Sequence, residues 1–256
     1  MMKSPILRAT VALASLIVAG TTASAQSTSA LPPAATLLAK YATAVGGPAF
    51  TAAKSVLTKG GMSMPAAGIN ATFLLTQVAP NQMSMVTEIP GMGKIEAGFD
   101  GTTAWSMDPM QGARLLTGKE LDQIRDESDR RAAIRSPEMF SAVQTVADTT
   151  MNSERCYLVK LTWKSGRETH DCYSAATGLM VASKSVQKTA MGDIPVVTMF
   201  SEYKKFGDVT VATKTVQEAM GQQQVLTISS VELGNGAGVT VTPPAAVQAL
   251  VKAPAK

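Results

Sequence analysis

Apolar and polar residues alternate along most of the chain beyond residue 55, which is the pattern of half-buried β-strands. In residues 82–89, Met83 and Met85 alternate with polar residues, and residues 155–163 form a second alternating series that ends at Trp163. Such alternation predicts one apolar and one solvent-exposed face of the sheet. The predicted strands span residues 55–64, 71–78, 82–89, 94–99, 103–107, 145–150, 155–163, 168–174, 179–188, 195–205, 209–219 and 223–233.

Short turns separate these strands, and they are marked by Pro80-Asn81, Pro90-Gly91, Asp100-Gly101, Thr177-Gly178, Gly207-Asp208 and Gly221. Strands joined by short turns with little intervening helix form antiparallel meanders rather than parallel βαβ units. We therefore predict a mainly β (α+β) fold, in which one curved antiparallel sheet carries a few helices on one face. Either the sheet closes on itself, or part of its apolar face stays open as a cavity.

Helical spacing is confined to three short stretches. Residues 34–45 have apolar positions at helical spacing and stop at Gly46-Gly47, a normal C-terminal signal. A second helix is predicted from Thr117 to Ile134, with the Thr117 hydroxyl and the Glu120 carboxylate forming a capping box. Ser136-Pro137-Glu138 predicts the start of a third, shorter helix.

The N-terminal residues predict an exported protein. Lys3 and Arg8 form a positive region, residues 11–20 an apolar region, and Ala23-Ser24-Ala25 a small-residue cleavage site. We expect residues 1–25 to be a signal peptide cleaved after Ala25, residues 26–34 a flexible leader, and residues 35–250 a single domain. The expected location is the periplasm, with secretion as an alternative.

Hydropathy, cysteine positions and net charge argue against a transmembrane segment, a lipid anchor at the cleavage site and a nucleic acid partner. The apolar run near the N-terminus is too short to span a bilayer and no later run is longer, so we expect no transmembrane segment in the mature chain. No cysteine stands near the cleavage site to carry a lipid. The formal net charge is +4, and loss of Lys3 and Arg8 lowers it to +2, which argues against a nucleic acid partner.

The two cysteines are expected to form a disulfide. Cys156 and Cys172 lie in two predicted strands joined by a turn at residues 164–167, and counting from that turn places them almost opposite each other. Cross-strand Cα distances of about 5 Å allow bridging, and a loop this short contributes about 3 kcal/mol. The competing interpretation, a reactive thiol pair, lacks both a CxxC spacing and an obvious activating base.

Fifteen methionines are the unusual feature of the composition, and several form MxM triplets, as in Met62-Ser63-Met64 and Met83-Ser84-Met85. Unbranched thioethers make an adaptable apolar lining suited to acyl chains, but they also simply fill a core. A third interpretation is Cu(I) binding, since thioether sulfur favours this soft ion. That interpretation requires the strands at residues 55–64 and 82–89 to be neighbours.

Catalytic side chains are scarce, so we predict no enzyme, no cofactor and no metal centre. His170 is the single histidine, and we expect it on the strand face opposite Tyr173 as a solvated side chain. Its only possible acidic partners are Asp171 and Glu168. The sequence has no GxSxG elbow, no HExxH and no phosphate loop, and the carboxylates Asp126 and Glu127 lie in an arginine-rich helix.

Several stretches together resemble the outer-membrane lipoprotein-sorting (LolA/LolB-like) superfamily. They are the helix ending in AVGG, the strand SVLTKGGMSMPAAG, the APNQ turn, the GFDGTTAW hairpin and the later EYKKFGDVTVATKTVQE. The resemblance covers about residues 35–245. It implies an incomplete β-barrel whose helices cover a concave apolar face, and whose cavity receives lipid acyl groups.

The resemblance and the residue pattern together define an expected apolar cavity. The helix at residues 118–134 is the candidate lid over it. The expected lining residues are Met62, Met64, Phe73, Met83, Met85, Phe99, Trp105, Leu121 and Ile124. For Trp105, anchoring of the core beside the hairpin turn is an equally good interpretation.

The expected function is non-enzymatic binding of a hydrophobic ligand, either a lipid or an acylated lipoprotein, with transport as one use of it. The alternative is an envelope regulator or scaffold that binds a protein partner through the same fold. The missing lipidated cysteine argues against the membrane-anchored acceptor branch of the superfamily. Ligand identity, direction of transfer and oligomeric state are not encoded in any recognisable motif.

Overall fold

The computed structural model describes residues 30–189 and 192–252, and residues from Leu31 onward form one compact unit. The expected signal peptide and residues 26–29 of the expected leader lie outside the described residues. Contacts of the chain begin before residue 35, because Ala34 opens the first helix and the Pro32 carbonyl accepts a hydrogen bond from Thr145 (2.7 Å). Within the described residues, no helix combines the length and the hydropathy needed to cross a membrane.

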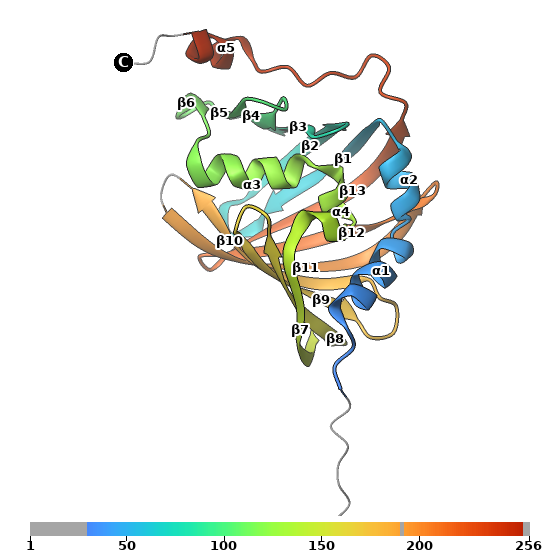
Figure 1. Cartoon of the computed structure of the whole chain (residues 1–256). Helices are drawn as coiled ribbons and strands as arrows, with labels where there is room; N and C mark the ends of the chain where they lie inside the picture. The colour runs from blue at the N-terminus through green and yellow to red at the C-terminus, as the bar shows by residue number, and fades with distance from the viewer. Residues whose placement is uncertain (1–29, 190–191, 253–256) are drawn as a thin grey trace, which may run out of the picture. The chain divides into compact units, whose positions relative to one another are not determined.

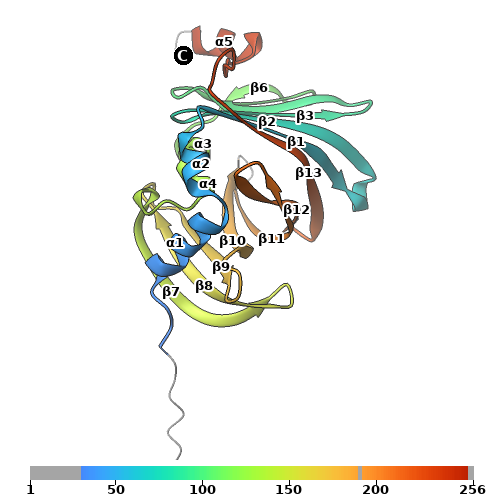
Figure 2. The same cartoon turned by 90° about the vertical axis from the view of Figure 1, so that its right-hand side faces the viewer.

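One antiparallel sheet of 13 strands dominates the described part of the chain, in the order β6-β5-β4-β3-β2-β1-β13-β12-β11-β10-β9-β8-β7. Because β6 and β7 are free edges, the sheet is curved but not closed into a barrel, as predicted (Figures 1 and 2). The strands are β1 (Ser55–Met64), β2 (Ile69–Val78), β3 (Gln82–Ile89), β4 (Gly93–Phe99), β5 (Ala104–Asp108), β6 (Gly112–Leu115), β7 (Phe140–Met151), β8 (Glu154–Trp163), β9 (Glu168–Ser174), β10 (Met180–Thr189), β11 (Gly192–Phe206), β12 (Val209–Ala219) and β13 (Gln222–Gly234).

The helices are short and lie on both faces of the sheet. Helices α1 to α4 lie on its inner, concave side, whereas α5 lies beyond β3 to β6 on the outer side (Figures 1 and 2). Their bounds are α1 (Ala34–Ala44), α2 (Gly47–Ala52), α3 (Gly118–Ser128), α4 (Arg130–Ala133) and α5 (Ala245–Lys252), with single 3₁₀ turns at Pro65–Ala67 and Pro137–Met139. The pattern of the sequence did not predict α2, α5 or β6.

The first helix ends where the sequence predicts. Gly46 adopts a left-handed conformation (φ 77°), and a Cβ atom there would lie 2.1 Å from the Asp208 carbonyl oxygen. Only glycine therefore fits at this close approach of the helix end to the β11–β12 turn.

The expected continuous helix from Thr117 to Ile134 is wrong in two respects. Asp129 is extended and breaks the helix into α3 and α4, and its carboxylate accepts a hydrogen bond from the Arg131 backbone N–H at the start of α4. The capping box is absent, because both Glu120 carboxylate oxygens accept hydrogen bonds from the Arg114 guanidinium at 2.9 Å. A bidentate, charge-assisted pair is stronger than a neutral capping bond.

The inner face carries the main core. Leu37, Leu38 and Tyr41 of α1 pack against Val159 and Tyr173 of the sheet, together with neighbours from α4 and β8. The predicted apolar inner face is confirmed in this region.

The expectation of a uniformly solvent-exposed outer face is wrong. One buried outer cluster contains Cys156, Cys172 and Ala182, and another contains Trp105 and Val247 of α5. The outer face is therefore covered in two places by apolar contacts, one of which involves a helix that the sequence pattern did not predict.

Candidate functional site

An apolar patch occupies the inner face of β1, β2, β3 and β13. Directly paired residues of antiparallel strands point to the same face, and the register pairs Leu226 with Met62 and Met62 with Ala71. The patch consists of the buried residues Met62, Ala71, Phe73 and Ile89 and the half-buried residues Ile69, Leu75, Met85, Leu226 and Ile228. All of these residues belong to strands. The patch is thus an apolar stretch of the concave face, and within the described residues all the buried and half-buried apolar side chains of its cluster come from strands.

Helix α3 covers the apolar residues beside this patch. Ile124 and Leu121 of α3 pack against Phe99 of β4 and Met83 of β3. The same helix contacts β10 on the far side of the concavity, so it bridges the two arms of the curved sheet. The position expected for a lid is therefore occupied by α3, next to the apolar patch rather than over it.

The expected lining residues do not form one cluster. Met62, Phe73 and Met85 belong to the apolar patch, whereas Met83, Phe99, Leu121 and Ile124 form the cluster under α3. Met64 belongs to neither cluster, and Trp105 lies on the other face of the sheet. Phe99 pairs with Ala104, and Gly98 pairs with Trp105, so Phe99 and Trp105 point to opposite faces. Trp105 is fully buried on the outer face, where its indole N–H donates a hydrogen bond to the Glu96 carboxylate (3.2 Å). The expected placement of Trp105 beside Phe99 is wrong, because adjacent strand positions alternate between faces.

The two MxM pairs do not form one cluster. Strand β2 lies between β1 and β3, and therefore separates Met62 and Met64 from Met83 and Met85. Two strand spacings correspond to about 10 Å, too far for thioether sulfurs to share one ion. The requirement of the Cu(I) interpretation for neighbouring strands is not met. Among the described residues, no group of three or more His, Cys, Asp or Glu side chains is arranged to hold a metal ion either.

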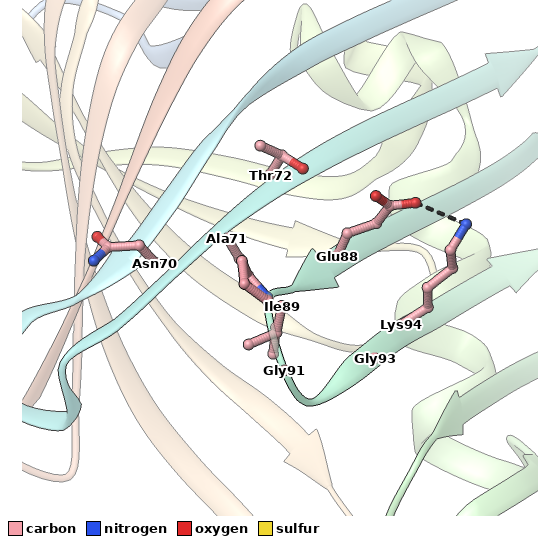
Figure 3. A pocket seen from close by; sticks show the side chains of 9 residues that line it. Asn70, Ala71, Thr72, Glu88, Ile89, Gly91, Gly93 and Lys94 are labelled. Carbon is pink, nitrogen blue, oxygen red and sulfur yellow. Dashed lines mark ion pairs between the residues drawn. The ribbon is translucent and has the colours of Figure 1, made fainter.

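Two cavities open at the end of β2 to β5, at the edge of the apolar patch. The first has a volume of about 520 Å³, and Figure 3 shows Ala71 and Ile89 of the patch within it. On its other side Glu88 and Lys94 extend toward each other from β3 and β4 and form an ion pair (2.7 Å). The second cavity, of about 600 Å³, shares Ile89 and Gly93 with the first.

The second cavity is bordered by exposed apolar residues at the tips of two hairpins. Met92 in the β3–β4 turn is 50% exposed, and Met110 in the β5–β6 turn is 86% exposed. Ile95 on β4 is also exposed. The end of the sheet beside the apolar patch therefore presents apolar side chains to solvent.

A third cavity, of about 320 Å³, lies on the inner face of β9 to β12 and is mostly polar. Helices α3 and α4 contribute Gln123, Glu127, Ala132 and Ala133 to its wall, and Arg135 follows α4. The remaining lining residues are Trp163, Arg167, Thr169, Ser183, Ser185, Gln187, Val196, Thr198, Phe200, Thr215 and Gln217. The concave face therefore changes from apolar to polar between β13 and β12, a change that the sequence analysis did not anticipate.

A buried ion pair lies beside the polar cavity. The fully buried Asp171 carboxylate accepts hydrogen bonds from Arg135 Nε (2.6 Å), Ser183 Oγ (2.6 Å) and the Tyr173 hydroxyl (3.3 Å). Burial lowers the pKa of Arg135, but the charge of Asp171 and its hydrogen bond, together with the neighbouring Tyr173 and Tyr41, outweigh this effect, and the net pKa is raised. For the two neighbouring tyrosines burial has the opposite effect: it raises the pKa of Tyr173, and it raises the pKa of Tyr41 to about 12. Arg135 is therefore a fixed cation with its counter-ion in place.

The second arginine of the cavity is also paired. Arg167 lies over the Trp163 ring (4.4 Å to the centroid) and donates to the Glu127 carboxylate at 3.1 Å, while Asp126 lies 3.4 Å from its Nε. Its buried Nη2 has no hydrogen-bond acceptor among the described residues. Asp126 and Glu127 thus pair with the β8–β9 turn rather than with the arginines of their own helix.

The structure does not assemble the possible catalytic group around His170. His170 is half-buried on the outer face, paired across the strands with Lys160 and Lys184. Asp171 points to the inner face and binds Arg135. His170 and Asp171 therefore lie on opposite sides of the sheet, and His170 is on the face opposite Tyr173, as predicted.

The predicted disulfide is present. Cys156 and Cys172 are bonded, with Cα atoms 5.5 Å apart, although the register pairs Cys172 with Leu158 and Cys156 with Ser174. The bridge therefore runs diagonally between β8 and β9 rather than between directly opposed residues. It lies on the outer face, away from the apolar patch.

Comparison with solved structures places this arrangement in a known fold. The chain is similar to a LolA superfamily protein from Nitrosomonas europaea, with 12% identity, a TM-score of 0.54, and coverage of 79% of this chain and 94% of the other. It is also similar to a DUF1329 family protein from Desulfovibrio piger, with 10% identity, a TM-score of 0.53, and coverage of 82% and 96%. No protein-family model matches the sequence, and no curated protein matches it.

The fold is LolA-like, as the sequence resemblance implied. At this level of identity the comparison establishes the fold, and the function has to be argued from the concave face itself.

Proposed function

We propose that this protein is a non-enzymatic binding protein of the periplasm, whose ligand is a lipid or an acylated lipoprotein. The apolar patch carries the proposal, because it lies on a concave face and no apolar side chain of α1 to α4 belongs to its cluster among the described residues. Its half-buried members, including Leu75, Met85 and Leu226, have surface left for an acyl chain. The LolA-like fold supports the same class of ligand.

Burial of the acyl chain supplies the driving force. Each buried methylene contributes about 0.8 kcal/mol, whereas association costs from about 4 kcal/mol upward. A short chain of a few carbons therefore binds weakly, and the affinity rises about fourfold with each added methylene while the patch has room. The methionines of the patch, Met62 and Met85, adapt to chains of different shape.

The test is native mass spectrometry of the protein purified from a bacterial periplasm, followed by organic extraction of the bound material. Phospholipid or acylated species at about one per chain support the proposal, and an empty protein contradicts it. Leu75→Gln reduces the bound fraction. Leu74→Gln is the matched control, because Leu74 is the adjacent half-buried residue of β2 and points to the outer face.

Export by residues 1–25 belongs to the same proposal, as does a single binding domain at residues 35–250. N-terminal sequencing of the periplasmic protein is expected to begin at Gln26. A chain that keeps Met1 and remains in the cytoplasm contradicts this part.

Helix α3 lies beside the apolar patch and bridges the two arms of the sheet, and we propose that it acts as a lid that moves aside when an acyl chain enters. A disulfide between Ile124→Cys and Ala104→Cys, two buried residues of the cluster under α3, is designed to hold the helix on the sheet. We expect the oxidised variant to take up little ligand and the reduced variant to recover uptake. Equal uptake in the two states contradicts the lid role.

The exposed apolar residues at the hairpin tips beside the second cavity favour one alternative function. In this alternative, the protein is an envelope regulator or scaffold that binds a protein partner. Met92 and Met110 at these hairpin tips have the exposed apolar surface that contacts between proteins use. This alternative predicts an empty protein in mass spectrometry. It also predicts that Met110→Ser, and not Leu75→Gln, weakens cross-linking to an envelope protein in cells.

A further inference from the structure

The polar cavity on β9 to β12 holds side chains that have no internal partner. Thr198, Thr215 and Gln217 face it from β11 and β12, and Ser185 and Gln187 from β10. Within the described residues, none of these five side chains makes a hydrogen bond to another residue. Three hydroxyls and two amides, each able both to donate and to accept, therefore line one inner wall without a hydrogen bond to another described residue.

The charges around this cavity are already compensated. Arg135 is bound to Asp171, and Arg167 is paired with Asp126 and Glu127. An anionic group entering the cavity meets arginines that already have carboxylate partners, so little net attraction remains. The groups left free for a ligand are the uncharged hydroxyls and amides, together with Nη2 of Arg167.

The polar cavity and the apolar patch adjoin each other on one continuous face. Thr215 of the cavity pairs with Leu226 of the patch, which in turn pairs with Met62. On the neighbouring row, the Gln224 amide of β13 donates to the Met62 sulfur and Gln224 pairs with Gln217. The hydrogen-bonding side chains of β12 therefore lie directly beside apolar side chains of β13 that belong to the patch.

Helix α3 also has an apolar side and a polar side, which face the corresponding regions of the sheet. Leu121 and Ile124 pack on the apolar side, while Gln123 and Glu127 line the polar cavity. Gln123 is fixed there because its side-chain oxygen accepts a hydrogen bond from the Lys188 backbone N–H (3.0 Å).

From this arrangement we infer that the polar cavity is the headgroup site of an amphipathic ligand, and that the headgroup is uncharged and bears hydroxyls. The acyl chain lies on the apolar patch, and the headgroup hydroxyls bind the free side chains of β10 to β12. The inference rests on the proposed function, since it assumes that an acyl chain occupies the patch.

The test compares three probes with the same palmitoyl chain by titration calorimetry or native mass spectrometry. They are monopalmitoylglycerol, methyl palmitate and 1-palmitoyl lysophosphatidic acid. We expect monopalmitoylglycerol to bind at least about tenfold more tightly than each of the others, because two or three net hydrogen bonds supply that factor. Equal affinities, or tightest binding of lysophosphatidic acid, overturn the inference and leave the proposed acyl binding in place.

Substitutions in the cavity test whether its side chains cause the preference for monopalmitoylglycerol over methyl palmitate. Thr198→Val with Gln217→Leu is expected to weaken monopalmitoylglycerol binding about tenfold more than methyl palmitate binding. Gln223→Leu is the control, since Gln223 is exposed on the outer face of β13 and pairs with Glu218. If the double variant does not fold, Thr215→Val is the second variant, expected to reduce the preference about threefold.

The remaining outcomes also discriminate. A preference for monopalmitoylglycerol that survives both variants overturns the headgroup site, because another part of the protein then reads the hydroxyls. If none of the palmitoyl probes binds, the proposed function and the headgroup site fall together.

Discussion

The Arg135–Asp171 ion pair provides the sharpest stability prediction, because its partners are fully defined. Asp171→Asn removes the charge but keeps the shape of the side chain, and leaves the Arg135 guanidinium buried without its counter-ion. Asp171 is fully buried and Arg135 has 17% of its side chain exposed. Stability is therefore lost mainly through the uncompensated cation rather than through a cavity.

The magnitude follows from the geometry. With Nε and Oδ2 2.6 Å apart, the charge centres are about 4 Å apart, which corresponds to about 4 kcal/mol at an effective dielectric constant of about 20. Removal of one partner of a buried pair costs about 3–5 kcal/mol, and the partial exposure of Arg135 favours the lower end. We therefore expect Asp171→Asn to lower the free energy of unfolding by about 3 kcal/mol.

The assay is a double-mutant cycle in urea with Asp171→Asn, Arg135→Met and the double variant. Unfolding is followed by tryptophan fluorescence, which Trp163 beside Arg135 reports directly. We expect the double variant to recover about 2 kcal/mol relative to the sum of the single variants. A coupling energy below about 0.5 kcal/mol refutes the reasoning, because the two charges then do not depend on each other.

Three further perturbations test the outer face and the buried tyrosines. Reduction of Cys156–Cys172 is expected to lower the free energy of unfolding by about 3 kcal/mol in urea, from the chain entropy of a bridge with a sequence separation of 16; a loss under 1 kcal/mol contradicts this. Gly98→Ala places a Cβ atom 2.3 Å from the Trp105 ring and is expected to cost about 1–3 kcal/mol, with Ala97→Gly as the control on the other face. Burial raises the pKa of Tyr41 from 10.0 to about 12, so the unfolded chain loses this proton first and stability falls as the pH rises above 10. By about pH 11 this effect of Tyr41 lowers the free energy of unfolding by about 1.4 kcal/mol. If the melting temperature of a Tyr41→Phe variant falls as much as that of the parent protein when the pH is raised from about 10 to about 11, the assignment to Tyr41 is contradicted.

The strand pattern predicted most of the sheet, because period-two alternation is a local property of each segment. The strands at residues 82–89, 168–174 and 209–219 were predicted with their observed bounds. The disulfide followed for the same reason, since a short turn fixes which residues of a hairpin meet. Helix α5 was missed, because its one buried residue, Val247, gives no periodic signal.

The site was harder to predict, since it depends on register between distant strands. Trp105 was assigned to the wrong face because its pairing with Gly98 cannot be read from a turn that allows more than one register. The polar cavity was missed for another reason. Ser183, Thr198 and Gln217 are spaced like the residues of any solvated strand face, and only the order of β10 to β12 shows that this face points inward.

The division of the concave face into an apolar and a polar region explains why α3 carries apolar residues on one side and polar residues on the other. A helix lying between an apolar patch and a polar cavity must satisfy both, and α3 does so by placing Leu121 and Ile124 on one side and Gln123 and Glu127 on the other. Movement of such a helix would uncover the polar cavity together with the apolar cluster around Phe99 beside the patch. An amphipathic ligand could then insert its chain and its headgroup in one step, whereas a purely apolar ligand would leave the hydroxyls of β10 to β12 to water. In the proposed binding mode, Thr198 and Gln217, which make no hydrogen bond to another described residue, give the concave face a preference for hydroxyl-bearing ligands that its apolar patch alone does not have.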